Sequence, residues 1–122
     1  MKLFDFFKGE KKEKPTRDKY WSLTTNDDEI INPTIEQIEQ AVQNATPKVS
    51  LFATLVYNHS GLEIETVQTL STEGVYRFEA LTSDGKIYVK NDIAYEETLE
   101  LFHQFYNYQR VPGFRRWPIE KY

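Results

Sequence analysis

The chain has 122 residues, which suits a single domain with one core, and aromatic side chains make up 15% of it. It contains no cysteine, so disulfide frameworks, thiolate metal sites and a cysteine nucleophile are excluded. No apolar run approaches the roughly 20 residues of a membrane-spanning helix, and the short, charged N-terminus does not resemble a signal peptide. We therefore expect a cytoplasmic protein without stable membrane insertion.

The net charge of −4 is distributed unevenly along the chain. Residues 26–100 carry four Lys and Arg against fourteen Asp and Glu, a net charge of −10, whereas the two ends carry seven against four and four against one, or +3 each. An acidic body repels nucleic acid and attracts basic partners, mainly by raising association rates. The same distribution also suits a surface that only keeps the protein soluble, so both interpretations stay open.

Residues 1–19 are interpreted as a charged, disorder-prone arm, and residues 20–122 as a single α+β domain. Residues 1–8 contain Leu3 and three phenylalanines, whereas residues 8–19 have almost no apolar side chains. The phenylalanine cluster could dock on the body, touch a membrane surface or have no role. Membrane anchoring would need a second signal, and the nearby lysines are a weak one.

A helix is predicted at about residues 34–45. Thr34 can cap its free amides, and Gln37 three residues later completes a capping box. Pro47 blocks any continuation. The apolar stripe at helical spacing consists of Ile35, Ile38, Ala41, Val42 and Ala45.

Four strands of an antiparallel meander are predicted next, at residues 49–57, 62–70, 75–82 and 86–90. Turn sequences separate them, and Asp84-Gly85 is a strong hairpin signal. Alternation is lost near Thr66, which predicts a bulge there. Alternation elsewhere predicts that the face toward the helices carries Leu62, Ile64, Tyr76, Phe78, Ile87 and Val89.

The last predicted element is a ring-rich helix at about residues 92–109, with Asp92 as its N-cap. In the tail, we expect Trp117 to fold onto the core and the arginines to pair with acidic residues of the body. The predicted fold is therefore a four-stranded antiparallel meander packed by an N-terminal and a C-terminal helix, in the order α-β-β-β-β-α.

No catalytic constellation is found in the sequence. His59 and His103 lie far apart and have no partner at metal-ligand spacing. The glycines are scattered and form no phosphate-binding loop, and Glu63 with Glu79 could form an acid–base pair but would more often be solvated. We therefore predict no catalytic residues, no metal, no cofactor and no enzyme activity.

A partner-binding surface is predicted instead on the sheet face away from the helices. Tyr88 would be its anchor, and glutamates on the same face would steer a basic partner. An acidic loop and the outer side of the first helix would extend this surface. The candidate residues are Glu63, Glu65, Glu79, Tyr88, Asp27, Asp28, Glu29, Glu36 and Glu39.

The order of these features resembles a known family. Asn32-Pro33-Thr34 opens a helix that continues Ile-Glu-Gln-Ile-Glu-Gln-Ala, a meander follows, and a late helix reaches Phe105 before Trp117. This pattern, over about residues 30–118, is similar to the small immunity proteins of bacterial polymorphic-toxin systems, in the family called immunity protein one. The resemblance implies a cytosolic antitoxin that binds and blocks one cognate toxin, often a nuclease, and that has no catalytic residues.

Two other hypotheses stay open at this point. A non-catalytic adaptor tethered by its Phe-rich N-terminus would depend on residues 1–8 for its localisation. A small enzyme would require a deep cavity with convergent polar groups. The charge pattern independently suits an inhibitor whose carboxylates imitate the phosphates that a basic nuclease binds.

Overall fold

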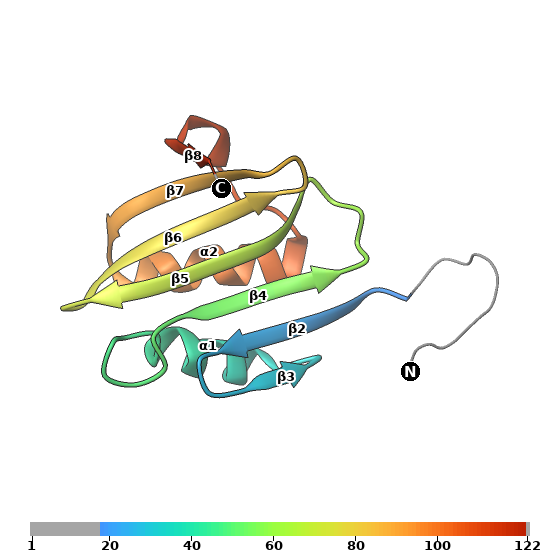
Figure 1. The fold of residues 1–122 in the computed structure, drawn as a ribbon. Coiled ribbons are helices and arrows are strands. Elements are labelled where there is room, and N and C mark those ends of the chain that lie inside the picture. Colours follow the sequence, from blue (N-terminus) through green and yellow to red (C-terminus); the bar gives the residue numbers. More distant parts are fainter. Residues whose placement is uncertain (1–17, 122) are drawn as a thin grey trace.

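The computed structural model describes residues 18–121, which form one antiparallel sheet with both helices on the same side of it (Figure 1). The strand order in the sheet is β3-β2-β4-β5-β6-β7-β8. The strands are β2 (Tyr20–Thr25), β3 (Glu29–Ile31), β4 (Ala53–Asn58), β5 (Ile64–Thr72), β6 (Val75–Thr82), β7 (Lys86–Ile93) and β8 (Ile119–Lys121). The helices are α1 (Ile35–Gln43) and α2 (Tyr95–Tyr108), and η2 (Phe114–Arg116) is a 3₁₀ turn.

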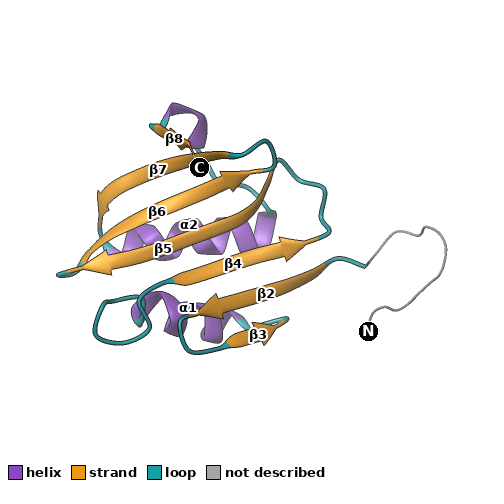
Figure 2. Ribbon diagram, viewed as in Figure 1, coloured by secondary structure: helices purple, strands orange, loops and turns teal. Residues whose placement is uncertain are grey.

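The expected four-stranded meander in the order α-β-β-β-β-α is therefore wrong. Within the described residues the sheet has seven strands, because β2 and β3 precede α1 and β8 follows α2. β2 pairs with β4 along its whole length, and β8 pairs with the outer edge of β7 (Figure 2). The predicted arm at residues 1–19 and the Phe-rich segment lie almost wholly outside the described residues.

The prediction for α1 is confirmed at its N-terminus. Thr34 Oγ1 accepts a hydrogen bond from Gln37 N, and Gln37 Oε1 accepts one from Thr34 N, which completes the capping box. The apolar stripe of this helix buries Ile38, Ala41 and Val42. Local signals alone thus position α1, and its opposite side remains exposed to solvent.

The start predicted for the second helix is wrong. Asp92 is not an N-cap but lies near the end of β7 with a positive φ of 60°. The N-cap of α2 is Ala94, which makes no side-chain capping bond. Thr98, in the first turn, donates its hydroxyl to Ala94 O instead. This helix is therefore held in place by the packing of Leu101, Phe102 and Phe105 and not by an N-terminal side-chain cap.

The strands also differ from expectation at their ends. The strand predicted at residues 49–57 begins only at Ala53, and Val49 and Leu51 lie in the preceding loop with 54% and 44% exposure. Leu51 has a positive φ of 65°, which interrupts any regular alternation. The bulge expected near Thr66 is present as a register shift between Ile64 and Thr66.

The facing of β7 is opposite to the prediction. Tyr88 is paired with Ala80 and lies on the helix side, so Ile87 and Val89 point to the other face. The reason is the C-terminal segment, since Phe114 meets the Tyr88 ring edge-on with 4.9 Å between ring centroids. A second register shift lies between residues 76 and 78 of β6. After it, Ile93 pairs with Tyr76, and both side chains are buried in the core.

The core lies between the sheet and the two helices. Phe78 is fully buried at its centre, with Phe102 of α2 and Trp117 of the tail each edge-on to its ring at 5.4 and 5.8 Å. The prediction that Trp117 folds onto the core is confirmed. Trp21 of β2 stacks on Tyr57 at 4.2 Å, which packs the edge of the sheet that the sequence did not predict.

Replacing Tyr76 with phenylalanine is expected to lower the free energy of unfolding by about 1 kcal/mol, because the Tyr76 hydroxyl donates to Val42 O at 3.0 Å. Burial raises the pKa of Tyr76 above its ordinary value of 10.0, so the folded state holds this proton more tightly than the unfolded chain. The contribution of the protonated Tyr76 hydroxyl to the free energy of unfolding is fully present below about pH 10. It is lost as the pH rises through the pKa of Tyr76 in the folded state.

The measurement is urea unfolding of the wild type and Tyr76→Phe between about pH 8 and about pH 11. The wild type should lose stability more steeply with rising pH than the variant does. Parallel pH dependences in the two proteins would contradict this assignment.

Candidate partner-binding surfaces

The face of the sheet away from the helices is covered by no element of the described chain (Figure 2). A chain of side-chain hydrogen bonds, which we call the polar ladder, crosses it from β4 to β8. Thr54 Oγ1 donates to Gln68 Oε1 at 2.6 Å, and Gln68 Nε2 donates to Glu79 Oε1 at 3.0 Å. Arg77 donates through Nε to Glu79 Oε2 at 2.7 Å and through Nη2 to Glu120 Oε1 at 2.6 Å.

The polar ladder leaves little free negative charge on this face. Both carboxylate oxygens of Glu79 are already hydrogen-bonded, and its side chain is only 13% exposed. Arg77 bridges Glu79 and Glu120, so the three groups together carry a single net negative charge, and these two carboxylates raise the pKa of the guanidinium. A face of this kind is rigid but offers little electrostatic attraction to a basic partner.

Most other residues predicted for the sheet face are also engaged or lie elsewhere. Glu65 Oε2 accepts hydrogen bonds from Ser60 Oγ and from Gly61 N, which ties it to the β4–β5 connection. Glu63 pairs with Arg115 of the tail, as expected for a tail arginine. Tyr88 is only 7% exposed, so the predicted anchor is part of the core and the prediction of its position is wrong.

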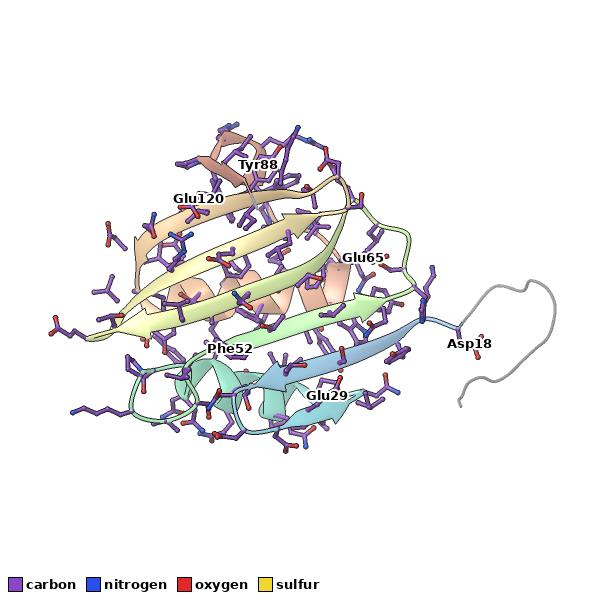
Figure 3. All side chains as sticks on the ribbon, in the orientation of Figure 1. Asp18, Glu29, Phe52, Glu65, Tyr88 and Glu120 are labelled. Carbon is purple, nitrogen blue, oxygen red and sulfur yellow. The ribbon has the colours of Figure 1, made fainter. Side chains whose placement is uncertain are left out.

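Figure 3 shows how far apart these residues lie. Tyr88 and Glu120 are found at one edge of the sheet, Glu29 at the opposite edge, and Glu65 at the end where β4 and β5 connect. The register explains this spread, because Glu29 on β3 and Tyr88 on β7 are separated by four intervening strands. The structure therefore does not bring the predicted residues together into one site.

The helical layer, in contrast, gathers carboxylates on segments that contain no lysine or arginine. Residues 20–47 and 91–109, which contain α1 and α2, have no Lys or Arg. The outer surface of the two helices, which we call the acidic helical face, carries Glu36, Glu39, Glu96, Glu97 and Glu100. Glu36 and Glu39 belong to the predicted set, whereas the three carboxylates of α2 were missed.

Two contacts position these carboxylates, and one of them brings a lysine that offsets part of the charge. His103 Nε2 lies 2.8 Å from Glu39 Oε2 and so connects α2 with α1. Lys90 Nζ reaches Glu97 Oε2 at 2.5 Å from the neighbouring strand. Among the described residues, Glu36, Glu96 and Glu100 have no ion-pair partner. Glu100 Oε2 accepts one hydrogen bond, from Gln104 Nε2 at 2.9 Å, and its other oxygen accepts none.

Tyr95, the first residue of α2, is a group on which carboxylates of both helices act. Burial raises the pKa of the Tyr95 hydroxyl, and the negative charges of Glu39 and Glu96 raise it further. Carboxylates from both helices therefore act on the same group. The Glu39–His103 contact also joins the two helices, so their carboxylates belong to one continuous surface.

A pocket of about 250 Å³ lies where the β2–β3 hairpin meets α1. Asp27 and Asp28, both predicted site residues, stand at its exposed rim, and the buried Leu23 and Ala41 line its base. Its full lining is Leu23, Thr25, Asp27, Asp28, Ile30, Gln37, Gln40, Ala41, Asn44 and Ser50. Glu29, the third residue of the predicted acidic loop, does not line it.

No protein-family model matches this chain, and comparisons with curated proteins and with solved structures found no match. No helix between residues 18 and 121 is long and apolar enough to cross a membrane. In the same part of the chain, no three His, Cys, Asp or Glu side chains are grouped as metal ligands.

Proposed function

We propose that this chain is a binding protein that recognises one basic protein through the acidic helical face. Within that class, we propose an immunity protein that works in the cytoplasm and neutralises a bacterial toxin, such as a basic nuclease. The observation that carries the proposal is the charge of the helical layer, in which both helices contain carboxylates and no lysine or arginine. The family resemblance of the sequence points the same way.

The acidic helical face has the properties that such an inhibitor needs. Its carboxylates stand on helices that the core and the Glu39–His103 contact hold in place. Binding therefore costs little backbone conformational freedom. Carboxylates arranged on a rigid surface attract a phosphate-binding protein and occupy the positions that phosphates would take. The main expected effect of this charge is a faster encounter with the toxin, and the effect weakens as salt screens it.

Neutralising the helical face should slow association with the partner by about tenfold. The variant carries Glu36→Gln, Glu96→Gln and Glu100→Gln. A matched control carries Glu63→Gln, Glu73→Gln and Asp84→Asn, three exposed carboxylates at turns and ends of the sheet. Both variants change the net charge by the same amount. The control also removes the ion pairs of Glu63 with Arg115 and of Asp84 with Lys86, so its loss of association rate is an upper limit for the effect of net charge alone.

The experiment uses the full chain as bait in its native cell lysate, followed by kinetic binding at low and high salt with the captured protein. Stoichiometric capture of one basic protein, a larger loss of association rate in the helical variant than in the control, and suppression of the captured protein's toxicity would support the proposal. Equal losses in the two variants would reject the helical face, and capture without any loss of toxicity would reject the immunity role.

A further inference from the structure

We infer that the pocket between the β2–β3 hairpin and α1 receives the side chain of one arginine or lysine of the basic partner. The inference rests on the proposed function for the identity of the partner. The chemistry of the pocket is what selects a cationic side chain. This would make the pocket the place where the partner is anchored, next to the face that attracts it.

The size of the pocket favours a side chain over a small-molecule ligand. Small-molecule and cofactor sites usually enclose about 300–1,000 Å³. The pocket here measures about 250 Å³ and is open to solvent along its rim. One long side chain that enters from a partner suits this volume, and a cofactor does not.

The lining combines an apolar base with acidic and amide groups at the rim. Leu23 and Ala41 are 1% and 8% exposed, so the base can pack the methylene stem of an arginine or lysine. Asp27 and Asp28 then meet the charged head group at the rim. This division between an apolar stem site and an anionic head site matches the two parts of a long cationic side chain.

Hydrogen bonds from the hairpin and from Ser50 in the loop after α1 hold these carboxylates in position and leave each with a free oxygen. Ser50 Oγ donates to Asp27 Oδ2 at 3.0 Å, and Glu29 N donates to Asp28 Oδ1 at 2.8 Å. Thr25 N also donates to Asp28 O at 2.9 Å, which closes the turn. Within the described residues, Asp27 Oδ1 and Asp28 Oδ2 accept no hydrogen bond, so both can accept one from a guanidinium.

The amide side chain of Gln40 on α1 adds a further acceptor to the lining of the pocket. Gln40 Nε2 donates to Asn44 Oδ1 at 3.3 Å, which leaves the Gln40 carbonyl oxygen available. A guanidinium carries five donors in a planar fork, whereas an ammonium carries three, so arginine makes fuller use of the acceptors at this rim. The carboxylates on the hairpin and the Gln40 amide on the helix therefore favour arginine over lysine at this position.

The test is a titration of the isotopically labelled full chain with N-acetylarginine methylamide, followed by amide chemical shifts in NMR spectra. N-acetylcitrulline methylamide is the neutral control, because it has the same shape without the charge. We expect saturable shifts at Asp27, Asp28, Asn44 and Ser50 with the arginine probe and none with the citrulline probe. The double variant Asp27→Asn, Asp28→Asn should lower the affinity for the arginine probe by about threefold or more.

Glu36→Gln serves as the control for charge on the neighbouring surface, since Glu36 lies on the acidic helical face but does not line the pocket. It should leave the affinity of the arginine probe unchanged. Two outcomes would overturn the inference. One is that the shifts spread over α1 and α2 and that Glu36→Gln reduces them as much as the double variant does. The other is that the arginine probe causes no saturable shifts. This result is independent of the capture experiment, so the pocket can fail while the proposed function stands, and the reverse.

Discussion

Replacing Phe102 with alanine is expected to lower the free energy of unfolding by about 3–5 kcal/mol. Phe102 is fully buried on α2 and meets Phe78 of β6 edge-on at 5.4 Å. Phe78 in turn contacts Trp117 at 5.8 Å, so the cavity would open where helix, sheet and tail meet. The loss combines the missing burial of the ring with the poor filling of the space it leaves.

The measurement is urea unfolding followed by far-ultraviolet circular dichroism. Tyr108→Ala, on the same helix but 62% exposed, is the control and should change stability by no more than about 0.5 kcal/mol. A loss below about 1 kcal/mol for Phe102→Ala would mean that α2 is not packed on the sheet as described.

Replacing Arg77 with methionine is expected to lower the free energy of unfolding by about 1–3 kcal/mol. The side chain of Glu79 is 13% exposed, and Arg77 supplies one of its two hydrogen-bonding partners and its counter-charge. Methionine keeps much of the aliphatic length, so the loss reports mainly on the unpaired carboxylate. An exposed pair such as Lys86 with Asp84 should contribute far less, because solvent screens it.

A double-mutant cycle with Glu79→Gln separates the ion pair from simple packing. Glutamine removes the buried charge, so Arg77→Met together with Glu79→Gln should recover part of the stability lost in Arg77→Met. The coupling free energy should be at least about 0.5 kcal/mol. Strict additivity of the two single changes would show that the polar ladder does not act as a connected unit.

The parts of the fold that the sequence predicts are those encoded by local signals. The capping box of Thr34 and Gln37 and the stripe that follows lie within one short segment, so α1 is found at its observed start. The hairpin of β6 and β7 at Asp84-Gly85 is found for the same reason. Capping and turn signals that span only a few residues do not depend on contacts with distant parts of the chain.

The missed strands depend on partners that are distant in sequence. β2 is only six residues long and is defined by its pairing with β4, as in Trp21 opposite Tyr57. β3 and β8 have three residues each, too few to show any alternation. The alternation in residues 86–90 allows either Tyr88 or its neighbours Ile87 and Val89 to face the helices. The contact of Tyr88 with Phe114 of the C-terminal segment determines which of them does.

The candidate site divides in the same way. The carboxylates of α1 were predicted because the helix itself was, but the engagement of Glu65 and Glu79 depends on neighbouring elements that sequence spacing does not reveal. The carboxylates of α2 could have been found, because residues 91–109 contain acidic residues without any Lys or Arg. Charge counted by segment was a better guide to the surface than alternation along strands.

The lack of Lys and Arg around both helices also determines how trypsin divides the protein. Trypsin cleaves after these residues, so α1 is released within residues 20–48 and α2 within residues 91–110. Each peptide contains the carboxylates of its helix and no internal cleavage site. Carbodiimide labelling of carboxyl groups, with and without a partner, would therefore report the protection of the acidic helical face from two peptides in one mass spectrum.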